Sequence, residues 1–151
     1  MNDLEVSEHF KLSELVKSDI AEKRGIKNIP ATFQIESLKY LVLHVLQPLR
    51  YALDRPVIVS SGYRCDELNL AVGGKWDSHH LCEGFFAAAD IIVPGLTPTE
   101  VQYEIWNHSL PVEECINEYG KWVHVSARRP QLEFLKASEQ GYDLVKFRGV
   151  S

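Results

Sequence analysis

Residues 78–93 read SHHLCEGFFAAADIIV and carry the strongest structural signal in the chain. The segment starts as a polar loop with two adjacent histidines and continues into an apolar run, Ala87 to Val93, which is typical of a buried strand. Asp90 lies within that run. A carboxylate in an apolar strand is costly unless it is paired or binds a metal, so Asp90 either holds a ligand or accepts backbone hydrogen bonds at a strand end.

A second strand-like stretch, WVHVS at residues 122–126, carries another histidine. Side chains alternate along a strand, so Trp122, His124 and Ser126 share one face while two valines take the other. We expect the valines to face the core, which leaves His124 beside an aromatic residue on the opposite face. Such a histidine is either a half-buried structural residue or a ligand.

Glu118 ends the strand that we expect just before this one, over residues 115–118. If residues 119–121 form a three-residue turn, Glu118 pairs with Trp122, and His124 becomes its diagonal neighbour at roughly 7–8 Å between backbones. That separation suits a carboxylate and a metal ligand with a water molecule between them. Otherwise Glu118 is an exposed acid at a strand end.

Arg64 follows another expected strand, residues 56–60, which Gly62 ends. A fixed guanidinium group can bind a substrate carboxylate or stabilise a developing oxyanion. The alternative is an ordinary ion pair with Asp66 or Glu67.

The helices are predicted from periodicity and from start signals. Apolar residues at gaps of three and four predict one long helix from Thr32 to about Asp54, in which Pro48 should introduce a kink. Shorter helices are expected over residues 11–24, 66–72 and 97–108. Their signals are Ser13 and Ser18 as N-caps and Gly25 as a stop, then Thr97, Pro98 and Glu100 as N-cap, first helical residue and capping-box acid.

The order of these elements, helices first and then strands with helices between them, predicts an α+β fold in which N-terminal helices pack on a small, mainly antiparallel sheet. The tail, residues 132–147, should add a hairpin, or a strand with a short helix. The chain has 151 residues and no obvious linker, so we expect a single domain over residues 1–151, acting as a monomer.

Composition argues against several classes of partner. The net charge is −5 and Lys and Arg do not cluster, which argues against nucleic acid. No stretch approaches the ~20 apolar residues of a membrane span, so membrane insertion is not expected. Residues 1–5 lack the basic start and apolar core of a secretory signal, which predicts synthesis in the cytoplasm without a signal peptide. Three cysteines without a CxxC pair predict reduced thiols: Cys65, Cys82 and Cys115.

Seven ordered segments resemble a known family. They are FKLSEL (10–15), LQPLR (46–50), PVIVSSGYR (56–64), ELNLAVGG (67–74), SHHL (78–81), AADI (88–91) and WVHVS (122–126). From about His9 to Ser126 the chain is similar to the zinc D-alanyl-D-alanine carboxypeptidases, which are peptidase M15-like, and specifically to their small phage-type and prophage-type peptidoglycan peptidases. The resemblance implies a Hedgehog/DD-peptidase-like fold and an endolysin-like hydrolase, a zinc-dependent carboxypeptidase or endopeptidase. Its substrate would be the stem peptides of bacterial peptidoglycan, and its action on the cell wall would need release or delivery by other factors.

The resemblance also assigns roles to residues by their positions in these motifs. It implies that His80, Asp90 and His124 are the zinc ligands. It implies that Glu118 is the catalytic acid or base. Two supporting roles are implied as well: Arg64 for substrate binding or transition-state stabilisation, and Ser78 for support of the substrate site.

Two departures from the family pattern have consequences. The family usually has six residues between its first histidine and the aspartate, whereas nine separate His80 from Asp90 here. The extra residues fall in segment 82–87 and must be absorbed in a loop or bulge, because an odd number added to a regular strand would turn Asp90 away from the metal. Several branches also place an acid three residues before the last histidine, where this chain has Lys121.

Two other functions fit the sequence. A non-catalytic relative would serve as a binding or structural module, for example in a phage particle, and would have Asp90 turned away from both histidines. A zinc-independent hydrolase would use Cys82 as the nucleophile and His79 or His80 as the base. If segment 82–87 contains the extra residues, its two aromatic residues, Phe85 and Phe86, should either pack on the core or lie exposed beside the cleft.

Overall fold

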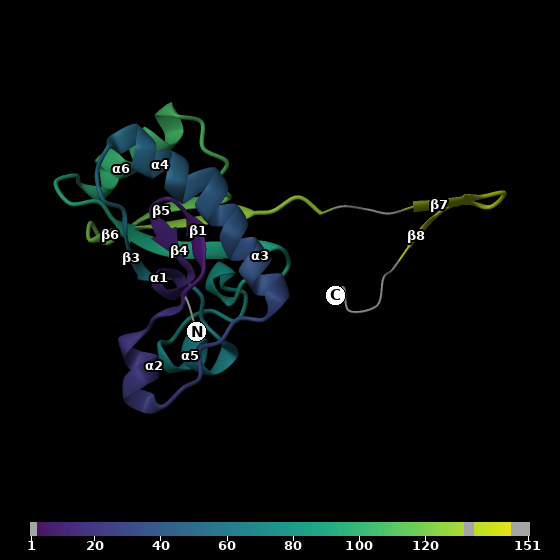
Figure 1. Cartoon of the computed structure of the whole chain (residues 1–151), viewed down its shortest axis with the longest axis horizontal. Coiled ribbons are helices and arrows are strands. Elements are labelled where there is room, and N and C mark those ends of the chain that lie inside the picture. Colours follow the sequence, from purple (N-terminus) through teal and green to yellow (C-terminus); the bar gives the residue numbers. More distant parts are fainter. Residues whose placement is uncertain (1–2, 132–134, 146–151) are drawn as a thin grey trace.

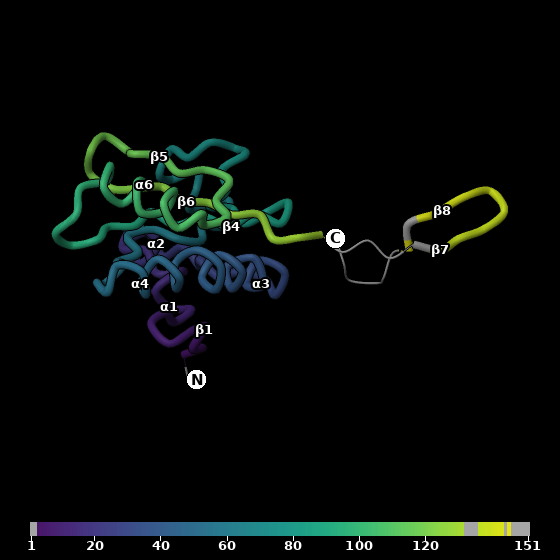
Figure 2. Tube along the Cα trace, turned by 90° about the horizontal axis from the view of Figure 1, so that it is seen from above, coloured from purple at the N-terminus to yellow at the C-terminus, as the bar shows by residue number. Residues whose placement is uncertain are grey.

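A four-stranded antiparallel sheet forms the centre of the computed structural model, which describes residues 3–131 and 135–145. The strand order is β3-β4-β6-β5, with the bounds β3 (Ile58–Ser61), β4 (Phe86–Ile92), β5 (Glu114–Glu118) and β6 (Trp122–Arg128). A long helical segment crosses one face of this sheet, and the view from above separates the helical layer from the strands (Figures 1 and 2). The predicted α+β class and antiparallel sheet are therefore confirmed.

The predicted long helix is continuous but not uniform. It consists of α3 (Thr32–Leu41), a π-helical turn η1 (Val42–Leu46) and α4 (Gln47–Leu53). The π turn ends two residues before Pro48, and the Gln47 N–H donates a hydrogen bond to the Val42 carbonyl there. The irregularity expected from Pro48 thus takes the form of one widened turn. The stripe that faces the sheet is fully buried: Leu38, Leu41, Val42, Val45, Leu46 and Leu49.

Alternation along β4 and β6 gives the sheet two different faces. The core face carries Ala87, Ala89 and Ile91 from β4 and Val123, Val125 and Ala127 from β6. The opposite face carries Asp90 and His124, which are direct partners in the β4–β6 ladder. The expected inward orientation of the two valines beside His124 is confirmed.

The shorter helices that were predicted follow the local signals with one exception, whereas the strands before residue 12 and the 3-10 turn at residues 79–81 were not predicted. Their bounds are β1 (Glu5–Ser7), β2 (Phe10–Lys11), α1 (Leu12–Val16), α2 (Asp19–Arg24), α5 (Asp66–Ala71), the 3-10 turn η2 (His79–Leu81) and α6 (Pro98–Asn107). Ser18 caps α2, Gly25 ends it with a φ of 65°, and Thr97 forms the expected capping box on α6. The prediction for Ser13 was wrong: it lies inside α1, where its hydroxyl bonds Asp3, and Lys11 occupies the N-cap position.

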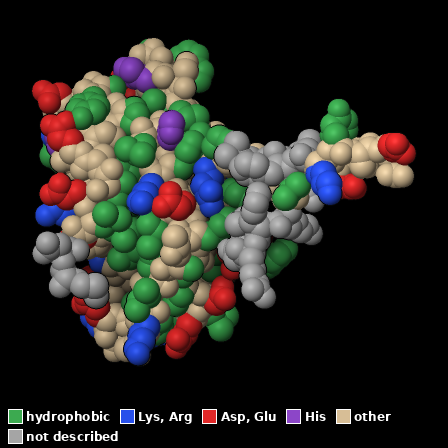
Figure 3. All heavy atoms as spheres, turned by 45° about the vertical axis from the view of Figure 1, so that its right-hand side comes forward, with side chains coloured by type: hydrophobic (Ala, Val, Ile, Leu, Met, Phe, Trp, Pro, Cys, Tyr) green, Lys and Arg blue, Asp and Glu red, His purple; other side chains and the backbone are tan. Residues whose placement is uncertain are grey.

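The C-terminal part forms a separate hairpin. Strands β7 (Leu135–Ser138) and β8 (Gly141–Leu144) pair antiparallel and project from the body (Figure 1). This agrees with the hairpin expected in the tail, although residues 132–134 and 146–147 of that prediction lie outside the described residues. On the face seen in Figure 3, acidic and basic side chains are interspersed among the coloured residues. Within the described ranges, no helix combines the length and apolar character that crossing a membrane requires.

Candidate metal centre

Three buried side chains from three different elements converge on the face of the sheet opposite the helices. His80 comes from η2, Asp90 from the middle of β4 and His124 from β6. Asp90 Oδ1 lies 3.2 Å from His80 Nε2 and 3.1 Å from His124 Nδ1, and the two imidazole nitrogens are 3.2 Å apart. The three residues are only 3%, 7% and 8% exposed. The structure therefore brings together all three residues that the resemblance implied as zinc ligands.

The outer nitrogen of each imidazole has an oxygen partner. His80 Nδ1 lies 2.7 Å from the Gly62 carbonyl, and His124 Nε2 lies 3.1 Å from Glu114 Oε1. A carbonyl and a carboxylate can only accept, so these two ring nitrogens carry the protons. In the neutral imidazoles the lone pairs of His80 Nε2 and His124 Nδ1 then point toward Asp90.

This arrangement fits a divalent cation. Two nitrogen lone pairs and a carboxylate oxygen at 3.1–3.2 Å repel one another unless positive charge lies among them. Two histidines and one acid, each oriented by an outer partner, are the donor set of a catalytic zinc site with an open position. Without a cation, burial would raise the pKa of Asp90, but hydrogen bonds and charge from the protonated forms of His124 and His80 outweigh burial and lower that pKa.

The segment in which extra residues were expected turns tightly before β4 begins. Cys82, Gly84 and Phe85 all have left-handed backbones, with φ of 54°, 61° and 71°, so the chain turns tightly there. From Phe86 onward the β4–β6 ladder is regular, and Asp90 keeps His124 as its partner. Asp90 consequently faces the histidines.

The two aromatic residues of segment 82–87 take different positions. Phe85 packs edge-to-face on Phe33, with ring centroids 5.1 Å apart, and the Arg129 guanidinium lies 4.8 Å from the Phe85 ring and 4.4 Å from the Phe33 ring. Phe86 stacks on His79 at 3.9 Å. One of the two phenylalanines therefore lies beside the candidate centre, and the other joins the aromatic contact with α3.

Arg64 and Ser78 both lie at the centre. Arg64 Nη2 is 3.6 Å from Asp90 Oδ2, so its ion pair is with Asp90 rather than with Asp66 or Glu67. Burial lowers the pKa of Arg64, and the charge of Asp90 opposes that effect. Ser78 Oγ accepts a hydrogen bond from the His80 backbone N–H and caps the turn that carries this histidine.

Two carboxylates of β5 share the face of His124. Glu118 pairs with Trp122 across the predicted three-residue turn, and it lines the cavity at the centre. Of these two, however, the carboxylate that bonds His124 is Glu114, which the sequence reasoning did not single out. Strand alternation could have identified Glu114. It precedes Glu118 by four residues on the same strand, and residues an even number apart on a strand share a face.

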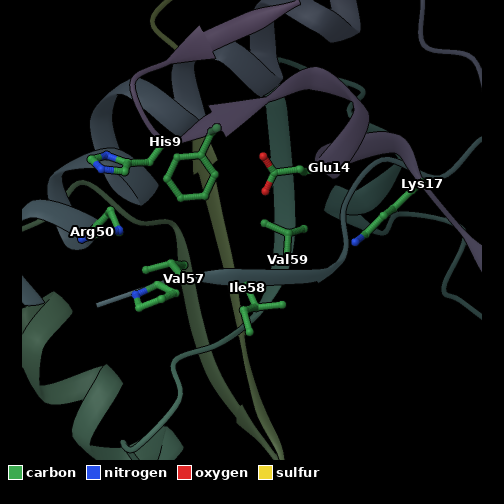
Figure 4. Close-up of a pocket in the computed structure, with 9 residues that line it drawn as sticks. His9, Glu14, Lys17, Arg50, Val57, Ile58 and Val59 are labelled. Atoms are coloured by element: carbon green, nitrogen blue, oxygen red, sulfur yellow. The ribbon is translucent and has the colours of Figure 1, made fainter. Parts of the chain in front are cut away.

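The cavity at the centre has a volume of about 390 Å³. Its lining includes all six predicted site residues: Arg64, Ser78, His80, Asp90, Glu118 and His124. A different cavity of about 320 Å³ lies between the N-terminal segment and β3, where His9, Arg50, Glu14 and Lys17 surround Val57 to Val59 (Figure 4). Because it contains none of the predicted residues, the metal centre is the stronger functional candidate.

The environment of Cys82 disfavours the alternative in which it acts as a nucleophile. The side chain is fully buried, and burial raises the pKa of its thiol to about 12. A thiol with that pKa is almost entirely protonated near neutral pH, whereas the thiolate is the nucleophile.

Comparison with known proteins gives one match. The model of the family described as Peptidase M15 matches residues 8–126. No curated protein and no solved structure matches the chain.

Proposed function

Because this chain belongs to the peptidase M15 family, a family of hydrolases, we propose that it is a zinc metallopeptidase whose metal is held by His80, Asp90 and His124. The observation that carries the proposal is the convergence of three buried donor atoms within 4.8 Å of one another. Both imidazoles have their outer nitrogens occupied, which leaves the inner lone pairs for a cation.

When bound, zinc would supply a Lewis acid that lowers the pKa of water and polarises a carbonyl oxygen. Glu118 lines the same cavity and is the proposed general base, which would take a proton from the attacking water and return it to the leaving amine. Arg64 would orient the substrate through its guanidinium group while its contact with Asp90 fixes its position. Ser78 would hold the turn that carries His80.

We propose peptidoglycan stem peptides as the substrate, cut by a carboxypeptidase or endopeptidase reaction. Two features of the cavity lining support a peptide substrate that carries a carboxylate and an apolar group. Arg64 and Lys75 both line the cavity and provide positive charge, and Trp122 provides an apolar surface beside it. The alternative of a non-catalytic module required Asp90 to face away from the histidines, and its Oδ1 instead lies within 3.2 Å of both.

The test combines metal analysis with hydrolysis. Zinc is measured in the purified protein, and hydrolysis of a synthetic stem peptide ending in D-Ala-D-Ala and of purified peptidoglycan is followed by mass spectrometry. Released D-Ala indicates a carboxypeptidase, and internal fragments indicate an endopeptidase. His124→Ala should abolish hydrolysis and zinc binding, whereas His108→Ala, at an exposed histidine directly after α6, should change neither. Full hydrolysis by His124→Ala, or a wild-type protein that binds no zinc, would refute the proposal.

A further inference from the structure

Glu114 makes three polar contacts through a single oxygen atom. Its Oε1 lies 2.7 Å from His79 Nδ1, 3.1 Å from His124 Nε2 and 3.2 Å from Ser126 Oγ. His79 Nδ1 is also 2.8 Å from Ser126 Oγ, so these side chains form a closed network. Glu114 therefore touches a proposed zinc ligand on the side away from the metal position.

The contact with Glu114 decides which ring nitrogen of His124 can bind a metal. A neutral imidazole carries its proton on either ring nitrogen, and only the unprotonated nitrogen can bind a metal. The carboxylate of Glu114 accepts from Nε2 of His124, which leaves the lone pair on Nδ1. This nitrogen is the one that lies 3.1 Å from Asp90 Oδ1 and 3.2 Å from His80 Nε2.

The surroundings hold Glu114 in place although it is partly exposed. Its side chain is 41% accessible, so it would sample several rotamers without partners. His79 supplies one fixed partner, because its ring stacks on Phe86 at 3.9 Å with an interplanar angle of 7°. Phe86 is in turn the first residue of β4, with the Arg128 guanidinium 5.5 Å from its ring.

We propose that Glu114 is a positioning residue that fixes the tautomer and ring orientation of His124, and that His79 and Ser126 hold Glu114 for this task. The inference rests on the proposed function, since the ligand that Glu114 positions is a proposed zinc ligand. It gives the two acids of β5 different roles: both line the cavity, but Glu114 bonds His124 and acts through it, whereas Glu118 is the proposed general base.

The test compares Glu114→Ala with Glu114→Gln. The amide oxygen of Gln can still accept from His124 Nε2, whereas Ala removes the acceptor. Loss of such an outer partner lowers metal affinity by about 10–100-fold in comparable sites. Glu113→Ala is the matched control, because it removes the same charge from the exposed preceding residue.

Two measurements are made on each full-length variant. The zinc dissociation constant is obtained by competition with a chromophoric chelator, and the His124 tautomer is read from ¹⁵N chemical shifts of the zinc-free protein at alkaline pH, where the imidazole is neutral. Glu114→Ala should weaken zinc binding by about 10–100-fold and move the proton partly to Nδ1, while Glu114→Gln and Glu113→Ala stay close to wild type.

The outcomes distinguish this inference from the proposed function. If wild-type protein binds zinc and Glu114→Ala binds it equally well with the same tautomer, the positioning role is wrong and the metallopeptidase proposal stands. If wild-type protein binds no zinc, the proposed function fails, and the tautomer measurement still decides what Glu114 does. A wild-type His124 with its proton on Nδ1 overturns the inference in either case.

Discussion

Gly62 lies against the backbone of α1 and also contacts His80 of the metal centre. We expect Gly62→Ala to lower both the stability of the fold and the affinity for zinc. A Cβ atom at this position would lie 2.2 Å from the Leu15 carbonyl oxygen, 2.8 Å from its carbonyl carbon and 3.0 Å from its Cα. These are backbone atoms of a fully buried residue of α1, so they cannot move aside as a flexible side chain would. Either α1 or the end of β3 must shift.

The expected loss of stability is the sum of two effects. Overpacking of this kind costs about 1–3 kcal/mol. The shift also weakens the hydrogen bond from the Tyr63 N–H to the Leu15 carbonyl, 2.7 Å in the native structure, which contributes about 1 kcal/mol. A total of about 3 kcal/mol corresponds to a decrease in Tm of roughly 6–12 °C for a chain of this size.

The same substitution should weaken zinc binding, since the Gly62 carbonyl accepts the hydrogen bond from His80 Nδ1 at 2.7 Å. We expect about a tenfold loss of affinity, at the lower end of the range for an outer partner, because the carbonyl is displaced rather than removed. Thermal denaturation measures the first effect and chelator competition the second.

Gly25→Ala is the control for this experiment. Gly25 ends α2 with a φ of 65° and has no atom within 4 Å of its Cβ position, so alanine there suffers only backbone strain of about 1–2 kcal/mol. Its zinc affinity should stay at the wild-type value. If Gly62→Ala keeps both the Tm and the zinc affinity of the wild type, the close approach of Gly62 to Leu15 does not limit this position and the reasoning is wrong.

Three further predictions concern catalysis, proton competition and helix capping. Glu118→Gln should lower kcat by about 10²–10⁴-fold, because an amide cannot take up the proton, and should leave zinc affinity unchanged; an equal loss of zinc would assign Glu118 to the metal instead. Burial lowers the pKa of His124, but hydrogen bonds with Asp90 and Glu114 outweigh burial and raise it above 6.5. Protons should therefore begin to displace zinc above pH 6.5 as the pH falls, and an affinity that stays constant from about pH 8 to pH 6 in chelator competition would contradict this. Thr97→Ala should lower the free energy of unfolding in urea by about 1 kcal/mol, since the Thr97 side chain accepts from the Glu100 N–H, and a loss of zinc affinity in this variant would be unexpected.

Local signals accounted for most of the elements. The capping box at Thr97, the cap at Ser18 and the turn between Glu118 and Trp122 were all predicted from residue type and spacing, and the structure contains them. Ser13 shows the limit of such signals. It has the side chain of an N-cap, but the helix begins at Leu12 with Lys11 as its N-cap, two residues earlier than an N-cap at Ser13 would place it, because β2 leads directly into α1.

The sequence likewise predicted some residues of the candidate centre and missed others. The motifs that carry His80, Asp90 and His124 are legible in the sequence, and alternation placed His124 on the face away from the core. The roles of these residues, and that of Glu118 as the base, stay predictions that the proposed experiments test. The network around Glu114 was missed, because His79, Glu114 and Ser126 meet only after three separate segments have packed.

The sequence alone determined the alternation of β4 and β6, the buried stripe of the long helix and the residue types at the metal centre. Each of these depends on the backbone period of one segment, which neighbouring residues set. Tertiary structure decided three other features. The loop at residues 82–85 kept Asp90 in register, Glu114 rather than Glu118 met His124, and Gly62 approached the backbone of Leu15. Those features depend on distances between segments far apart in the chain, and such distances are set by how the helices and the sheet pack around their common core.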